Sequence, residues 1–156
     1  MQLTEGIFMI KKSFSAALTL VLCYIFSACL AFMCFFAPTV FGRYFDGYRN
    51  LPSVAVTVTV TFYVCVPFAA VALYLLIKTL LRIKKREVLV SENVSAMRGL
   101  SWCCVAVCVI TGVAGIFYFP FFLVFAASGF FALILRVIKN VFAYAVDVKD
   151  ENDYTI

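Results

Sequence analysis

Histidine is missing from this sequence, and charged side chains of either sign are scarce. Only 13% of the 156 residues are Asp, Glu, Lys or Arg, whereas a soluble domain carries roughly 25%. Hydrophobic residues make up 65% of the chain. Because so few polar side chains cannot cover a surface that faces water, the sequence predicts an integral membrane protein whose surroundings are the lipid bilayer.

Stretches without any charge locate the membrane spans. Asp, Glu, Lys and Arg are absent from residues 13–42, 51–77 and 99–135. The third stretch would be about 55 Å long as one helix, far more than the roughly 30 Å of the hydrocarbon core. Pro120, within "YFPFF", breaks a helix, so we expect this stretch to fold back there. The prediction is a single domain over 1–156 with spans at 13–37, 53–77, 99–118 and 120–138.

An even number of spans puts both termini on one side of the membrane. Of the thirteen Lys and Arg residues, only Arg43 and Arg49 fall on the opposite side. Cytoplasmic segments are enriched in these cations, so we expect both termini in the cytoplasm. A cleavable signal peptide is a weaker interpretation of the N-terminus, because the uncharged stretch continues thirteen residues beyond Cys29. The predicted fold class is all-α, an integral membrane four-helix antiparallel bundle.

The missing residue types also exclude several kinds of chemistry. Without histidine the chain lacks the commonest general base and a frequent zinc ligand. The acids all fall outside the predicted spans, so buried carboxylates for a proton relay are absent. We therefore predict no enzyme activity, no catalytic residue, no metal site and no cofactor. The seven cysteines contain no CxxC pair and are interpreted as packing residues within the spans: Cys23, Cys29, Cys34, Cys65, Cys103, Cys104 and Cys108.

The few polar or small residues within the spans favour helix packing over substrate binding. We expect the hydroxyls of Thr57 and Thr61 to bond to the carbonyl four residues earlier or to a neighbouring helix. Pro67 predicts a kink in the second span, where a substrate groove is the less favoured alternative. Close packing of the third and fourth spans is predicted at their small residues, which are Gly112, Gly115, Ser128 and Ala132.

Two cytoplasmic segments carry organised polar sequence, the loop 79–98 and the tail 139–156. In the loop, a basic cluster precedes Ser91, which suits the start of a helix with Glu92 in its first turn. In the tail, apolar residues recur at helical spacing and predict that span four continues as a cytoplasmic amphipathic helix. The loop is basic and the tail acidic, so the two segments are expected to attract each other.

Two stretches resemble a known family. "LLRIKKREVLVSENVSAMRGLSW" and "RVIKNVFAYAVDVKDENDYTI" are similar to the loop and the C-terminus of small four-helix bacterial membrane proteins. These proteins share a domain of unknown function, the one numbered twenty-nine seventy-five. Departures from its pattern are Arg86 for a glycine, Leu89 for an aromatic, Met97 for a leucine and Tyr154 for a leucine. The resemblance implies a bacterial cytoplasmic membrane and a Cro/CI-type helix-turn-helix regulator encoded nearby.

The favoured function is a non-enzymatic membrane regulator that binds a cytoplasmic partner, such as that transcription regulator, through its loop and tail. A small transporter or bacteriocin-immunity-type protein is the alternative, and a structural subunit is a third. Self-association is possible, and no direct binding of nucleic acid is expected. The predicted partner-binding residues are Arg82, Lys84, Lys85, Arg86, Glu92, Asn93, Lys149, Glu151, Asn152 and Asp153.

Overall fold

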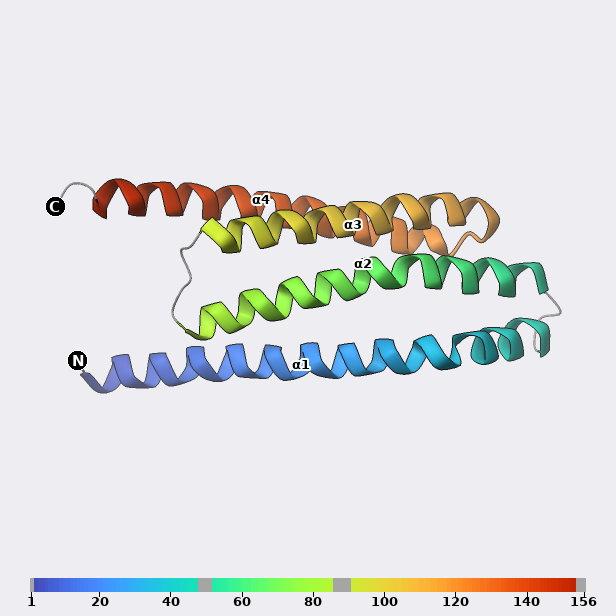
Figure 1. Cartoon of the computed structure of the whole chain (residues 1–156), viewed down its shortest axis with the longest axis horizontal. Helices are drawn as coiled ribbons and strands as arrows, with labels where there is room; N and C mark the ends of the chain where they lie inside the picture. Colours follow the sequence, from blue (N-terminus) through green and yellow to red (C-terminus); the bar gives the residue numbers. More distant parts are fainter. Residues whose placement is uncertain (1, 48–51, 86–90, 154–156) are drawn as a thin grey trace.

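Four long helices make up the protein. The computed structural model describes residues 2–47, 52–85 and 91–153. Its elements in chain order are α1 (Gln2–Gly42), the short π-helical turn η1 (Arg43–Gly47), α2 (Pro52–Lys84), α3 (Ser91–Phe117) and α4 (Phe121–Asp153). No strand occurs in these three ranges. Figure 1 shows the helices lying lengthwise beside one another, with both chain termini at the same end of the molecule.

All four helices contain a stretch that is long and apolar enough to cross a membrane. The prediction of an all-helical chain with four apolar helices of spanning length is therefore confirmed. The helices also run further than the predicted spans, since α2 continues to Lys84 and α3 begins at Ser91. Most of the predicted loop 79–98 thus consists of two helix ends, and residues 86–90 lie outside the described residues.

The break between α3 and α4 falls where Pro120 predicted it. Helix α3 ends at Phe117 and α4 begins at Phe121. A tight turn connects them, in which the amide of Phe121 donates to the carbonyl oxygen of Tyr118 at 3.0 Å. The proline has no N–H to offer to a continuing helix, so the chain reverses there.

Packing follows the order of the chain. Helix α1 lies against α2, α2 against α3, and α3 most extensively against α4. Within the described residues, helices that are not consecutive do not pack backbone against backbone. A row of this kind leaves much of each helix uncovered by protein.

The buried residues are small, and the exposed residues are large and apolar. The buried set includes Ala37, Ala55, Ala114 and Ala132, whereas Phe35 is 84% exposed. A soluble protein shows the reverse pattern. In a bilayer, the acyl chains solvate large apolar side chains, and small residues allow the helix backbones to approach closely.

Helices α3 and α4 approach closely at two of the small residues that the sequence indicated. A methyl group added to Gly112 would lie 2.9 Å from the ring of Phe125, and one added to Gly115 would lie 3.0 Å from the ring of Phe122. The glycines on α3 therefore receive phenylalanine rings of α4. Ser128 differs from the expectation of an interhelical contact, because its hydroxyl donates to the carbonyl oxygen of Phe125 in its own helix at 3.1 Å.

Candidate functional site

The predicted partner surface lies at the end of the molecule that carries both termini, where α2 ends and α3 begins (Figure 1). Arg82 and Glu92 form an ion pair there, with Nη2 of the arginine 2.6 Å from Oε2 of the glutamate. The arginine side chain is 21% exposed and the glutamate side chain 62%. This ion pair connects the last turn of α2 to the first turn of α3. Arg82 therefore contacts a neighbouring helix of its own chain.

The two lysines of the basic cluster are placed differently from Arg82. Lys84 and Lys85 are both exposed at the end of α2. Here the amide of Lys85 donates to the carbonyl oxygens of Leu81 and Arg82, at 3.2 and 2.9 Å. Arg86, the fourth cation of the cluster, lies outside the described residues. Lys84 and Lys85 are therefore the exposed cations among the described residues of the cluster.

Asn93 occupies an interior position. Its side chain is 1% exposed, and Val94 and Ala96 beside it are buried too. A polar side chain at such a position serves packing of the α3 start rather than contact with another protein. Sequence reasoning placed Asn93 on the partner surface because it follows Glu92. Burial at this helix start could not be inferred from the neighbouring residue types.

The described part of the predicted tail, residues 139–153, is helical. Helix α4 has 33 residues and continues without a break to Asp153, as the apolar spacing predicted. Lys149 and Glu151 are exposed on its last turns, and Asn152 and Asp153 belong to the same helix. In Figure 1, α4 extends beyond the first turn of α3. The final turns of α4 therefore project beyond the ends of α2 and α3, and the first turns of α1 extend towards the same end (Figure 1).

Helix α4 carries an apolar stripe that the described residues leave open. Val137, Val141, Tyr144 and Val148 follow one another at helical spacing and are 63%, 62%, 73% and 39% exposed. The side of α4 that faces α3 is a different one, which includes the buried Ala132. The basic cluster at the end of α2 does not pack against α4 in the described part of the chain. The α3 part of the predicted loop does meet the tail, since Arg98 and Lys139 line one pocket.

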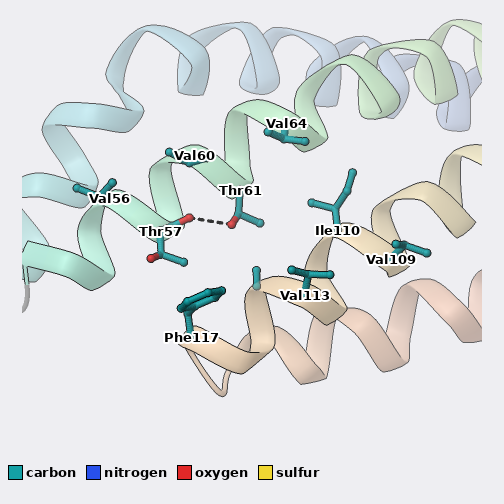
Figure 2. Close-up of a pocket in the computed structure, with 10 residues that line it drawn as sticks. Val56, Thr57, Val60, Thr61, Val64, Val109, Ile110, Val113 and Phe117 are labelled. Atoms are coloured by element: carbon teal, nitrogen blue, oxygen red, sulfur yellow. Dashed lines mark hydrogen bonds between the residues drawn. The ribbon is translucent and has the colours of Figure 1, made fainter.

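A second candidate region is an apolar groove between α2 and α3, shown in Figure 2. It encloses about 510 Å³ and is lined mainly by valines, with Ile110 and Phe117 from α3. Its two threonines face the groove, but their hydroxyls are bonded within α2. Thr61 donates to the carbonyl oxygen of Thr57 at 2.7 Å, and Thr57 to that of Ser53 at 3.0 Å. These bonds confirm the predicted backbone bonding and leave the groove suited to an acyl chain.

Aromatic side chains gather at the end of the molecule opposite the two termini. Phe45 in η1 is 5% exposed, and its ring meets the ring of Tyr118 edge-on at 5.8 Å. Arg43 is exposed in the same turn. Aromatic rings of this kind suit the level of the lipid headgroups. Arg49, which the alternative function involves, lies outside the described residues.

The cysteines all have free thiols and lie along the helices. Cys108 of α3 lies against α4, with its sulfur 3.5 Å from the carbonyl oxygen of Phe125. In residues 2–47, 52–85 and 91–153, His, Cys, Asp and Glu form no group of three or more that could hold a metal ion. The contact of Cys108 is one of helix packing, as the sequence predicted.

Comparisons with known proteins identify one family. No curated protein and no solved structure matches the chain. A family model with the description "Protein of unknown function (DUF2975)" matches residues 10–156, which is nearly the whole chain and includes all of α2, α3 and α4. The protein therefore belongs to the DUF2975 family.

Proposed function

We propose that this protein is a non-enzymatic regulator in the bacterial cytoplasmic membrane that binds a soluble protein through the projecting end of α4. In this proposal the four helices form an antiparallel membrane domain with both termini in the cytoplasm. Support for that orientation comes from the cations, since Lys84, Lys85 and Lys149 belong to the end that carries both termini, and cytoplasmic segments are enriched in such residues.

The observation that carries the proposal is the length of α4. A helix of 33 residues is about 50 Å long, whereas the hydrocarbon core measures roughly 30 Å. If Phe121 lies at one edge of the core, the last turns extend about 20 Å past the other edge. Tyr144 and Val148 fall in this part and are exposed. An apolar helix face in water is a common element of protein recognition, in which it lies in a groove of the partner.

The family resemblance indicates the kind of partner, a helix-turn-helix transcription regulator. Binding at the membrane would remove such a regulator from DNA, so the chain itself would not need to contact nucleic acid. The alternative, a small transporter or bacteriocin-immunity-type protein, has less support. Its groove would have to carry a polar solute, but the space between α2 and α3 is apolar and the hydroxyls of Thr57 and Thr61 are bonded within α2.

A photo-crosslinking experiment tests the proposal. A photoreactive phenylalanine analogue replaces Tyr144 in one variant and Tyr74 in the matched control, both exposed tyrosines, at 73% and 64%. Each variant is co-expressed with the helix-turn-helix regulator, and the covalent adduct is measured in isolated membranes. We expect the adduct at position 144 and none at position 74.

The proposal also predicts a functional effect of the same surface. Replacing Val148 by Asp places a charge on the apolar stripe and should abolish the adduct at position 144, while the protein remains in the membrane. A reporter gene under the regulator should then respond as it does when the membrane protein is absent. No adduct at position 144, or equal adducts at 144 and 74, would show that this surface does not bind the regulator.

A further inference from the structure

A polar pocket lies between α3 and α4, towards the end of the hairpin opposite the turn at Pro120. It encloses about 130 Å³, and its lining residues are Arg98, Ser101 and Trp102 from α3 and Arg136 and Lys139 from α4. The larger groove in Figure 2 is apolar by contrast. Three cations, one hydroxyl and one indole therefore meet at a single place in a chain that has few charges.

The two walls of the pocket are held together by a direct bond. The hydroxyl of Ser101 donates to the carbonyl oxygen of Ala132 across the two helices at 3.1 Å. Both residues are buried, at 7% and 6% exposed. Because this bond lies within the helix pair and away from water, it fixes the spacing of α3 and α4 beside the pocket. The cations of the pocket thus extend from a rigid support.

Trp102 holds one of the cations in place. The guanidinium carbon of Arg136 lies 5.9 Å from the centre of the indole ring, within the range of a cation–π contact. Such a contact leaves the N–H groups at the edge of the guanidinium available to an acceptor. Arg136 is therefore orientated without having its hydrogen-bond donors used.

No acid with a described side chain balances the charges in the pocket. Among the acids whose side chains the structure describes, Glu92 pairs with Arg82, and none lies within 4 Å of the cations of Arg98, Arg136 or Lys139. Like charges that share a small pocket repel one another. A bound anion would remove this repulsion. Arginine forks match the oxygens of a phosphate group in two parallel hydrogen bonds, and lysine adds a point charge.

The depth of the pocket matches the headgroups of a lipid bilayer. Along helices at 1.5 Å per residue, Arg136 is about 22 Å and Lys139 about 27 Å from Phe121, where α4 begins. Arg98 is about 28 Å from Phe117, where α3 ends. With the turn at Pro120 at one face of a roughly 30 Å hydrocarbon core, these side chains reach the other face. Basic pockets between helices at this level suit anionic lipid headgroups.

We propose that Arg98, Arg136 and Lys139, with Trp102 and Ser101, form a binding site for a phosphate group. The group belongs either to the headgroup of an anionic phospholipid or to a soluble phosphorylated molecule. The site is separate from the exposed stripe on α4 that the proposed function involves, so each proposal can fail without the other.

Trp102 makes the site directly measurable, because it is the single tryptophan of the chain. Lipids with brominated acyl chains quench the fluorescence of a tryptophan that they contact. The purified protein is placed in phosphatidylcholine vesicles that contain phosphatidylglycerol at a fixed low fraction, and the bromine is carried by either lipid. We expect brominated phosphatidylglycerol to quench Trp102 well beyond its share of the lipid. Quenching in proportion to the lipid share would overturn the lipid source.

The matched variants separate the pocket from general attraction to the membrane. R98Q/K139Q removes two pocket charges and keeps the contact of Arg136 with Trp102. K84Q/K85Q removes two exposed charges at the same end of the molecule. We expect the preference for phosphatidylglycerol to fall about tenfold in R98Q/K139Q and to change little in K84Q/K85Q. An equal loss in the two variants would show that only the overall charge matters and would overturn the site.

The soluble source is tested by adding inorganic phosphate and glycerol phosphate to the protein in neutral detergent. If phosphate shifts the emission of Trp102 in the wild type, but not in R98Q/K139Q, the site takes a soluble phosphate. If neither lipid nor soluble phosphate acts on Trp102 in the wild type, the proposal is wrong. Those wild-type measurements decide the question even if R98Q/K139Q fails to fold, and R98K/K139R then supplies a variant that keeps both charges and should retain the preference.

Discussion

Alanine at two glycines of the α3–α4 pair should change stability in opposite directions. A Cβ atom at Gly115 would lie 3.0, 3.1 and 3.2 Å from three atoms of the Phe122 ring. Carbon atoms prefer to be about 3.5–4.0 Å apart, so the ring or the helix must move by about half an ångström. At Gly129 the Cβ atom would meet one sulfur, that of Cys108, at 3.3 Å. That thiol can rotate away.

The magnitude follows from two opposing terms. Replacing Gly by Ala within a helix stabilises it by about 1 kcal/mol, and this term applies to both sites. Overpacking at a rigid contact costs about 1–3 kcal/mol, and it applies to Gly115 because a ring cannot yield as a single sulfur can. We therefore expect G115A to reduce the free energy of unfolding by up to about 2 kcal/mol and G129A to raise it by up to about 1 kcal/mol.

The assay is reversible unfolding of the purified protein in mixed micelles of a mild detergent and dodecyl sulfate, followed by circular dichroism. Both variants are compared with the wild type under the same conditions, and each serves as the chemical control of the other. If G115A and G129A changed the free energy of unfolding equally, the close contact between Gly115 and Phe122 would not determine the packing of α3 and α4. The reasoning about small residues at this interface would then be wrong.

Three further substitutions test which polar contacts of the side chains contribute to the free energy of unfolding. Ser101→Ala removes the hydroxyl that joins α3 to α4 and should lower the free energy of unfolding by about 0.5–1.5 kcal/mol, measured in the same mixed micelles. Thr57→Val with Thr61→Val should change stability by less than about 0.5 kcal/mol, because both hydroxyls bond only to α2; a large loss of stability would show that they hold another helix. Glu92→Gln should cost less than about 1 kcal/mol, because its side chain is 62% exposed and water screens its pair with Arg82, and high salt should reduce even this difference.

The helices themselves were predictable from local signals. Missing charges indicated where four apolar helices lie, Pro120 indicated the reversal between Phe117 and Phe121, and the Ser91–Glu92 pair indicated where α3 begins. These features depend on the length of an apolar run, on a missing N–H group or on the first turn of a helix. Each is a property of neighbouring residues, so the sequence alone determines it.

Which face of each helix meets another helix was decided by the tertiary structure. The apolar stripe of α4 is exposed, at 63% for Val137 and 62% for Val141, whereas Ala132 is buried against α3. Lipid solvates a valine about as well as another helix does, so hydrophobicity does not distinguish a buried face from an exposed one in a membrane. A buried face is distinguished by small residues at which two helix backbones approach closely. Such an approach depends on the residues of both helices, not of one.

The same limit applies to the polar residues. Asn93 is buried although Ser91 and Glu92 just before it are exposed. Arg98, Arg136 and Lys139 meet in one pocket although about forty residues separate the first from the others. The amino-acid sequence by itself determined that the chain forms four helices long and apolar enough to cross a membrane, with a reversal at Pro120. Only the tertiary structure decided which side chains meet, because those contacts arise from the register between helices rather than from the composition of any one of them.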